Sequence, residues 1–510
     1  MNSLNYLRSI LFTLGLEEVK TLEKFILLNN DSKSAQNSKS LQLVQLILNE
    51  EHFSASDIQR TLYNKLNYSA FNKLVNRLKE KTLEVILLDA NIKRAGFSER
   101  SRTIFELRMK MMQIEVLILK GMRDKIVDEL NLTIKKANEF EVYDVLIQAL
   151  YSKQRFQGLD MGVAKAEKLK DSIRRAELKW TSLNYSQSKF NELISKISSS
   201  SSSESYKVDL NIGLKSLEVE YNKTQAPTIG YYYYLLLVEK FQNEQNYAGA
   251  GKHLNKLNNL IENNRSVYSK YRLGSTALNI ANNYIFLKDL NASAENLILA
   301  KEYFANQPAN LAILNEIELY NLFYKGELDE ARQSLNSLVK YTRSLNTPLL
   351  LDKRLYFLAC LDYINQDFTK CLETILQCHE LDKDKEGWNI LKRIMMTLFR
   401  IETEEYESAE LKLSNLDKFI KRILKTKNIR PRYLLIVRIL RKLINENFDY
   451  VQVYGSRSKY FELLESDDHQ YKWEIKSAEL IIFEDWFKAK MKKTPYNHFA
   501  IMKNKFKRSA

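Results

Sequence analysis

Five segments of this chain share one pattern of residue types at a nearly constant spacing. Each has an aromatic residue or leucine, a small residue three positions later, and further apolar or small residues seven and ten positions later. Successive segments start 43, 38, 40 and 38 residues apart, at Tyr247, Leu290, Leu328, Phe368 and Tyr406. A repeat of about 20 to 50 residues indicates stacked helical or strand units that share one continuous core. We expect a degraded sixth copy to begin at Phe448.

Glycine and proline are scarce, which decides between helices and strands as the repeated element. Only 13 glycines and 5 prolines occur among 510 residues, whereas the two together average about 12 %. Sandwiches, barrels and doubly wound sheets need these residues at their turns. The sequence therefore predicts an all-α protein, built from long helices and short turns.

Each copy of the pattern follows an apolar helical stretch and a polar pair suited to a turn. Pro308, Pro348 and Pro431 lie between copies, where proline can end one helix and occupy the first turn of the next. The unit is therefore a helical hairpin. Stacked hairpins form an α-solenoid, with a concave groove lined by the first helix of each unit.

This unit resembles the tetratricopeptide repeat, whose second helix begins Tyr-x-x-Ala. The closest match is Gly-Glu-Leu-Asp-Glu-Ala at residues 326–331. The resemblance covers about residues 227–447 and implies a solenoid that binds a protein or peptide. The spacing of about 40 exceeds the family period of about 34, which indicates longer helices or looser junctions. Some family members capture a C-terminal carboxylate with recurring Asn and Lys, but this activity is not implied here, because the corresponding positions hold Glu239, Asn282, Tyr320, Cys360 and Leu398.

The rest of the chain divides around the repeats. Residues 448–510 are expected to form capping helices and a basic tail. No proline and no legible repeat precede Pro227. We expect a helical N-terminal domain over residues 1–110 and irregular helical hairpins over residues 111–226. The serine-rich residues 198–205 are expected to form a flexible connection, because they bury little apolar area.

Residues 53–86 predict two helices around a short turn. Ser54 and Asp57 are suitable N-cap residues for the first helix, and the second begins at Tyr68 with one apolar and one basic side. This layout resembles a helix-turn-helix, whose second helix can enter a major groove. It is also typical of a hairpin that only packs within a helical domain, and the missing turn glycine favours this alternative. The candidate DNA contacts are Lys73, Arg77 and Lys81.

Two segments concentrate the net charge of +15. Residues 418–442 contain ten basic residues and no acidic one, and no acidic residue follows Asp485, where aromatic residues alternate with lysines. Such a composition suits RNA or single strands, an acidic protein surface, or simple solvation. The expected partner contacts are Lys421, Arg422, Lys425, Arg430 and Arg432.

Four consecutive tyrosines begin the first helix of the array. Adjacent residues point around a helix, so some of these rings must face the groove or solvent, and tyrosine is favoured at interfaces. Alternatively, two of them pack inside and two cover a neighbouring turn. The candidate groove contacts are Tyr231, Tyr232, Tyr233, Tyr234 and Asn282.

The sequence contains no legible catalytic or metal constellation. No two of its 5 histidines have ligand spacing, and phosphate loops and nucleophile elbows are missing. Cys371 and Cys378 occupy packing offsets of the repeat and are expected to be buried hydrophobes. We therefore expect no enzymatic activity, cofactor or metal. The few cysteines favour a reducing compartment, and the longest apolar run, residues 229–238, is too short for a bilayer, so we expect a cytoplasmic protein.

These observations lead to three hypotheses. The first is a scaffold or adaptor that binds a protein or peptide partner, acidic or otherwise, in the solenoid groove. The second is a transcriptional regulator with an N-terminal helix-turn-helix and a repeat array as its sensor. The third is an RNA- or ribosome-associated protein that binds through its basic C-terminal end.

Overall fold

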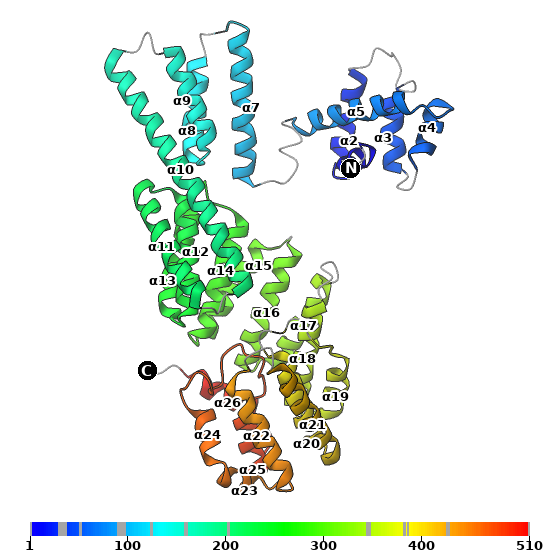
Figure 1. Ribbon diagram of the computed structural model, residues 1–510, viewed down its shortest axis with the longest axis vertical. Coiled ribbons are helices and arrows are strands. Elements are labelled where there is room, and N and C mark those ends of the chain that lie inside the picture. The colour runs from blue at the N-terminus through cyan, green and yellow to red at the C-terminus, as the bar shows by residue number, and fades with distance from the viewer. Residues whose placement is uncertain are drawn as a thin grey trace. The chain divides into compact units, whose positions relative to one another are not determined.

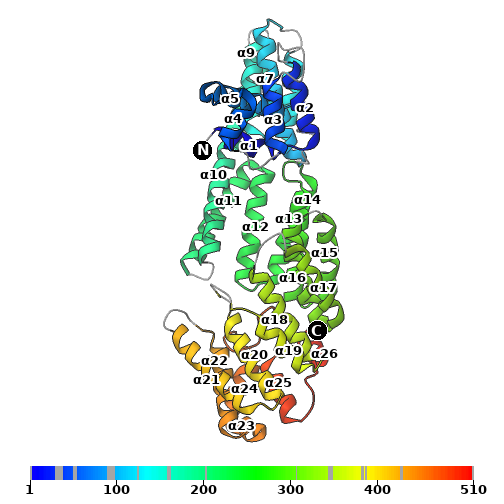
Figure 2. The same cartoon turned by 90° about the vertical axis from the view of Figure 1, so that its right-hand side faces the viewer.

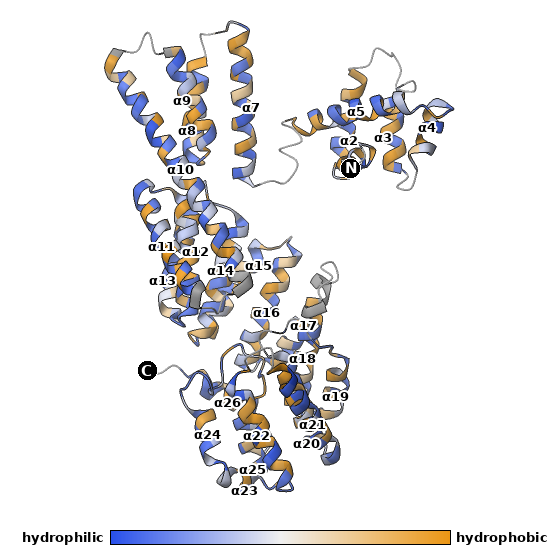
Figure 3. Cartoon of the chain, viewed as in Figure 1, coloured by the Kyte–Doolittle hydropathy of each residue, from blue (hydrophilic) through white to orange (hydrophobic). Residues whose placement is uncertain are grey.

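Every element of the computed structural model is a helix, and no strand occurs in the part of the chain that it describes (Figure 1). The chain forms two compact units: residues 1–185 with 265–267, and residues 186–264 with 268–510. Orange and blue residues alternate around most helices in Figure 3, the pattern of amphipathic helices. The described residues are 3–28, 38–49, 54–88, 98–122, 126–157, 162–200, 204–305, 307–342, 348–380, 384, 387–424 and 429–507.

The N-terminal part of the first unit has a hydrophobic core of its own. Helices α1, α2 and α3 pack on α5, and α4 packs on α3. The predicted apolar face of α5 is buried in this core through Phe71, Leu74, Val75 and Leu78. These helices are α1 (Ser3–Leu11), α2 (Leu16–Leu28), α3 (Lys39–Asn49), α4 (Ala55–Tyr63) and α5 (Tyr68–Ile86).

The predicted hairpin at residues 53–86 is confirmed as α4 and α5. Ser54 caps α4 with a reciprocal capping box to Asp57, which satisfies two backbone donors at once. The turn needs one left-handed residue, and Asn64, with φ 56°, occupies the place usually taken by glycine. The buried Gln59 side chain accepts a hydrogen bond from the Asn67 backbone at 3.1 Å, which ties α4 to the start of α5.

Four further helices follow in chain order. Helix α7 packs on α8 and α9, and α8 packs on α9. The predicted serine-rich connection coincides with the end of α10 and the start of α11, with residues 201–203 outside the described residues. The helices are α7 (Glu99–Leu119), α8 (Ile126–Glu139), α9 (Tyr143–Gln157) and α10 (Gly162–Ser200).

The second unit is an α-solenoid of stacked helical hairpins, as predicted. Within each hairpin the two helices pack together, and each hairpin packs on the next. Pro227, Pro308, Pro348 and Pro431 each begin the first helix of a hairpin. The helices are α11 (Glu204–Thr224), α12 (Pro227–Asn243), α13 (Tyr247–Asn263), α14 (Lys270–Phe286), α15 (Leu290–Tyr303), α16 (Pro308–Lys325), α17 (Leu328–Thr342), α18 (Pro348–Ile364), α19 (Phe368–Gln377), α20 (Trp388–Glu402), α21 (Tyr406–Ile423) and α22 (Pro431–Asn445).

The register of the repeat is confirmed to the residue. Helices α13, α15, α17, α19 and α21 begin at the five residues that open the pattern. The small residues at the third offset are all fully buried, which lets neighbouring helices approach closely. These residues are Ala250, Ser293, Ala331, Cys371 and Ala409, each 0 % exposed.

A left-handed residue lies two positions before each of these second helices. It ends the preceding helix, as expected at a helix C-terminus. The five residues are Gln245, Lys288, Gly326, Gln366 and Glu404, with φ of 55°, 60°, 80°, 62° and 58°.

The same left-handed turn identifies two hairpins that the pattern of residue types did not place correctly. Glu141, with φ 54°, precedes α9 in the same way, so α8 and α9 form an additional hairpin in the first unit. Near the C-terminus, Phe448 has φ 63° and α23 begins at Tyr450. The predicted sixth start at Phe448 is therefore two residues early, because Phe448 is the turn residue itself.

The three cysteines are free and buried. Cys371 and Cys378 pack as the small hydrophobes predicted from their offsets. Burial raises the pKa of all three thiols, that of Cys378 to about 11. Among the described helices, none combines the length and apolar character needed to cross a membrane.

Candidate functional site

The groove of the solenoid already holds a piece of the chain itself. After α23 (Tyr450–Ser456) and α24 (Ser458–Glu465), residues 466–482 run without a helix before α25 (Phe483–Met491) and α26 (His498–Lys505). We call residues 466–482 the return segment. It lies against the first helices α14, α16 and α18, and α26 packs on α16 (Figure 1, Figure 2).

Lys476 is the centre of this contact. Its ammonium group donates to the Asn282 side chain on α14 at 2.7 Å. Its backbone N–H donates to the Tyr324 hydroxyl on α16 at 2.7 Å, and its carbonyl accepts from Tyr320 one turn earlier. Asn282, predicted to contact a partner in the groove, therefore binds a segment of its own chain.

The tyrosines of the first helices bond the main chain of the return segment and also contact its side chains, since Lys476 lies 5.3 Å from the Tyr320 ring centroid and Trp473 packs on Tyr324. The Tyr356 hydroxyl on α18 donates to the Ala478 carbonyl at 2.8 Å. Burial raises the pKa of Tyr324 and Tyr356, so both remain neutral phenols that can donate a hydrogen bond.

Arg432 on α22 also holds the return segment. Its guanidinium is 0 % exposed and binds both oxygens of Glu479 at 2.6 Å and one oxygen of Glu484 at 2.5 Å. Burial alone would lower the pKa of Arg432, but the two carboxylates outweigh it and raise the pKa. The interpretation of Arg432 as a partner contact is wrong, because this side chain is inside the protein.

Of the other predicted basic contacts, one is bonded within the chain and two are exposed to solvent. Arg430 donates to the carbonyls of His469 and Lys472 and pairs with Glu474 at 3.1 Å. Lys421 and Arg422 are exposed at the end of α21, and Lys425 lies outside the described residues.

The aromatic residues of the C-terminal region do not form a stacking surface for nucleic acid. Trp486 and Phe487 are 0 % exposed, and the Tyr496 hydroxyl accepts from the Ile482 backbone. The Trp486 indole donates to Glu402 on α20, which also pairs with Lys490 at 3.0 Å. The predicted alternation of lysines and aromatics is thus mainly a hydrophobic core with paired lysines around it.

The four tyrosines of α12 are half-buried and divide as two and two. Tyr232 and Tyr233 pack on a cluster from α10, α11 and α12. Tyr231 and Tyr234 pack on a cluster from α13 and α14, where Arg272 lies 4.2 Å from the Tyr231 ring. Their main contacts lie within the solenoid, in accord with the packing alternative.

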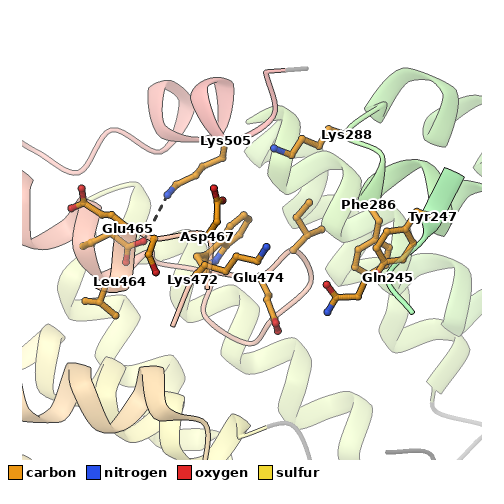
Figure 4. Close-up of a pocket in the computed structure, with 14 residues that line it drawn as sticks. Gln245, Tyr247, Phe286, Lys288, Leu464, Glu465, Asp467, Lys472, Glu474 and Lys505 are labelled. Atoms are coloured by element: carbon orange, nitrogen blue, oxygen red, sulfur yellow. Dashed lines mark ion pairs between the residues drawn. The ribbon is translucent and has the colours of Figure 1, made fainter. Parts of the chain in front are cut away.

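An open cavity lies beside the return segment, with a volume of about 390 Å³. Its walls are the hairpin turns before α13 and α15, residues 464–467 and 472–475, Glu484 and Lys505. Figure 4 shows Tyr247 and Phe286 on one side of it and Leu464 and Glu465 on the other. The rings of Tyr247 and Phe286 stack with centroids 4.3 Å apart at an angle of 3°.

The charges of this cavity are only partly compensated. Among the described residues, Glu465 pairs with Lys488, Glu474 with Arg430, and Lys505 with Glu484; the last pair is dashed in Figure 4. No ion pair joins Lys288, Lys472 or Asp467 to another described residue. The cavity thus offers two available ammonium groups beside an aromatic wall, which can hold an extended peptide with an acidic group.

The candidate DNA contacts lie where the sequence predicts them. Lys73 and Arg77 are exposed on α5, and Lys81 is half-buried one turn further along the same face. Burial, and then the charge of Arg77, lower the pKa of Lys81. None of the three forms an ion pair with another described residue.

Lys476, Glu479 and the cavity are not among the residues and sites that the sequence predicts. One signal was present, because residues 480–483 form an apolar run in an otherwise polar segment and indicate burial. Its location in the groove had no local signal.

In the described parts of the chain, no cluster of three or more potential ligands could hold a metal ion. The chain matches no protein-family model and no curated protein sequence.

His498 on α26 gives the region a testable pH dependence. The ring bonds the Phe323 carbonyl at 2.8 Å and is 2 % exposed. Burial lowers its pKa from 6.5 to about 4, although the bond to Phe323 opposes this. Below pH 6.5 the unfolded chain therefore binds a proton at His498, whereas in the folded chain His498 stays neutral down to about pH 4. We expect stability to fall by about 3 kcal/mol from this group as pH falls from 6.5 to 4, and no effect above 6.5.

The measurement is urea unfolding of the wild type and His498→Gln across this pH range. As pH falls, the free energy of unfolding should decrease less steeply for the variant than for the wild type. The difference in slope should correspond to nearly one bound proton. Equal slopes for the two proteins would show that His498 is protonated in the folded state.

Proposed function

We propose that this chain is a non-enzymatic scaffold whose tetratricopeptide-like repeats bind an extended segment of a partner protein. The observation that carries the proposal is the way the groove holds the return segment. Tyr320, Tyr324 and Tyr356 bond its main chain, and Asn282 bonds one lysine. The same hydroxyl and amide groups are able to bond the main chain of another extended segment.

The cavity beside the return segment is the place for the partner. A peptide there adds to a surface that is already ordered, so the groove itself loses little conformational entropy on binding. The Tyr247 and Phe286 rings supply apolar contact, and Lys288 and Lys472 favour an acidic residue on the partner. The buried, free cysteines favour a reducing compartment, and we place the protein in the cytoplasm.

Site-specific photocrosslinking in the protein's own cells tests this proposal. A benzophenone side chain at Tyr247 should form one discrete adduct with a partner, and the same label at Leu411, 60 % exposed on α21, should not. Lys288→Glu should reduce the Tyr247 adduct about tenfold without changing the unfolding midpoint. Nuclease treatment should leave it unchanged. Equal labelling at both positions, or an adduct insensitive to Lys288→Glu, would remove the cavity as the site.

A second candidate function is DNA binding, which a specific observation on α5 favours. Lys73, Arg77 and Lys81 follow one another at four-residue steps on one face of a helix whose opposite face is buried. With α4, the four-residue turn and Asn64, this arrangement has the layout of a recognition helix. The chain would then be a regulator in which the repeats sense a partner.

We expect the full chain to bind duplex DNA with an affinity that falls as salt rises. Lys73→Glu with Arg77→Glu should abolish salt-sensitive binding in fluorescence anisotropy. Lys215→Glu with Lys256→Glu makes the same change of net charge on the solenoid and should bind like wild type. Equal losses in both double variants would reduce the effect to net charge, and no binding below about 10 μM would eliminate the function.

A further inference from the structure

The C-terminal part of the chain is joined to the solenoid by one short turn. The turn is residues 446–449, between α22 and α23. We call the part that follows it, residues 450–507, the C-terminal arm. The arm bonds α14, α16, α20 and α22 through four side chains, those of Lys476, His498, Trp486 and Glu479. None of these residues belongs to the turn, so the arm of a second copy can make the same contacts.

This turn is more strained than the other hairpin turns of the solenoid. The turns before α13, α15, α17, α19 and α21 each have one left-handed residue, whereas this turn has two in succession, Asn447 with φ 48° and Phe448 with φ 63°. Asparagine tolerates this conformation, but for a bulky residue such as phenylalanine it is a genuine outlier. Contact with the Tyr406 ring, with centroids 4.2 Å apart, keeps Phe448 in place. The turn therefore stores backbone strain.

Opening of the turn into a helix relieves this strain. Residues 446–449 include neither glycine nor proline, so α22 and α23 can continue through them as one helix. Both left-handed residues then adopt ordinary helical dihedral angles. A short connection under strain favours exchange of the segment that follows it between two copies of a chain.

An opened chain is stable only when its groove is filled again. The arm buries its large aromatic side chains against the solenoid, and opening exposes them to water. Phe461, Phe483, Trp486 and Phe487 are each at most 1 % exposed in the closed chain. The only surface shown to match this groove is the arm itself.

We propose that two copies exchange their C-terminal arms and form a two-fold symmetric dimer, in which each groove holds the return segment of the other copy. The exchange also concerns the cavity beside Tyr247 and Phe286, because residues 464–467 and 472–475 of its walls belong to the arm. In the dimer each cavity is therefore built from both copies, and the partner copy completes the site.

A mixture of two complementary full chains tests the exchange. One chain carries Arg432→Met, and the other carries Glu479→Leu with Glu484→Leu. Each chain alone is mismatched, because the first buries two carboxylates without their cation and the second buries a guanidinium without its carboxylates. After exchange, one groove pairs Arg432 with both glutamates and the other pairs only apolar side chains, so both arms are matched.

The two chains are unfolded in urea, mixed and refolded, and sedimentation velocity measures the products. The mixture should give a dimer of one copy of each chain, at least about tenfold more abundant than the dimer of either chain refolded alone. The wild type should refold as a dimer at high concentration and as a monomer at low concentration. A mixture that behaves as the sum of its two chains, or a wild type that is monomeric at every concentration, would overturn the exchange.

A second pair of variants tests the strained turn as its cause. Phe448→Gly removes the strain and should weaken the wild-type dimer about 100-fold, since the left-handed conformation costs a non-glycine residue roughly tenfold and two turns open. Tyr406→Ala removes the same ring contact without changing the turn residue and should not weaken the dimer. Circular dichroism confirms that both variants are folded. Equal dimerisation of Phe448→Gly and the wild type would overturn the role of the turn.

Discussion

Replacing Arg432 with alanine is expected to destabilise the second unit by about 3–5 kcal/mol. The side chain is fully buried, and its removal leaves Glu479 and Glu484 inside the protein without their cation. The carbonyl of Tyr471 also loses a donor at 2.7 Å. Urea unfolding followed by circular dichroism measures the loss as a lower midpoint. Arg438→Ala, on the exposed face of the same helix, should change stability by less than about 0.5 kcal/mol.

A compensated variant separates the charge effect from packing. Arg432→Met combined with Glu479→Leu and Glu484→Leu removes all three charges and should recover most of the loss, since buried ion groups can often be replaced by apolar residues of similar volume. A single Arg432→Ala variant as stable as wild type would mean that water reaches this site and screens the carboxylates.

The repeats could be predicted from the sequence because their determinants are local and periodic. Ala331 and Leu335, for example, lie within one helix, and the same offsets recur in every hairpin. The α4–α5 pair was predictable for a similar reason, since the cap at Ser54 and the apolar face of α5 need no distant partner.

The occupied groove could not be predicted, because its contacts join distant parts of the chain. Lys476 is 156 residues from Tyr320 and 194 from Asn282, and no local pattern indicates such a pairing. Arg432 illustrates the consequence. Its place among the ten basic residues of 418–442 predicts a surface contact with a partner, yet it is buried and pairs with two acidic residues about 50 positions later.

Because the return segment lies in the groove, this solenoid differs from one whose groove is open. The hydrophobic cluster of the repeats includes Ala478, Leu480, Ile481 and Ile482 together with the large side chains of α25. The C-terminal region is therefore part of the core of α16–α22, and the cavity at Tyr247 and Phe286 lies beside it.

A chain ending at Glu465 is expected to lose the cooperative unfolding of the second unit. It lacks Phe483, Trp486 and Phe487, each at most 1 % exposed. Each such side chain contributes about 1.5–3 kcal/mol on burial, and the four apolar residues of the return segment add to this sum. The total is comparable with the whole stability of a typical domain, about 5–15 kcal/mol. Calorimetry should show the transition of the second unit missing, with increased binding of a hydrophobic dye.

A point variant and an added peptide serve as controls for this experiment. Phe499→Ala removes a ring that is 60 % exposed on α26 and should unfold like wild type. Added in trans, a peptide of residues 466–507 should restore the transition of the truncated chain, because the groove and Arg432 recognise it without a covalent link. If the truncated chain instead unfolds at the wild-type midpoint, the return segment is a ligand on a finished solenoid. The groove itself, rather than the cavity, would then be the site that a partner peptide enters.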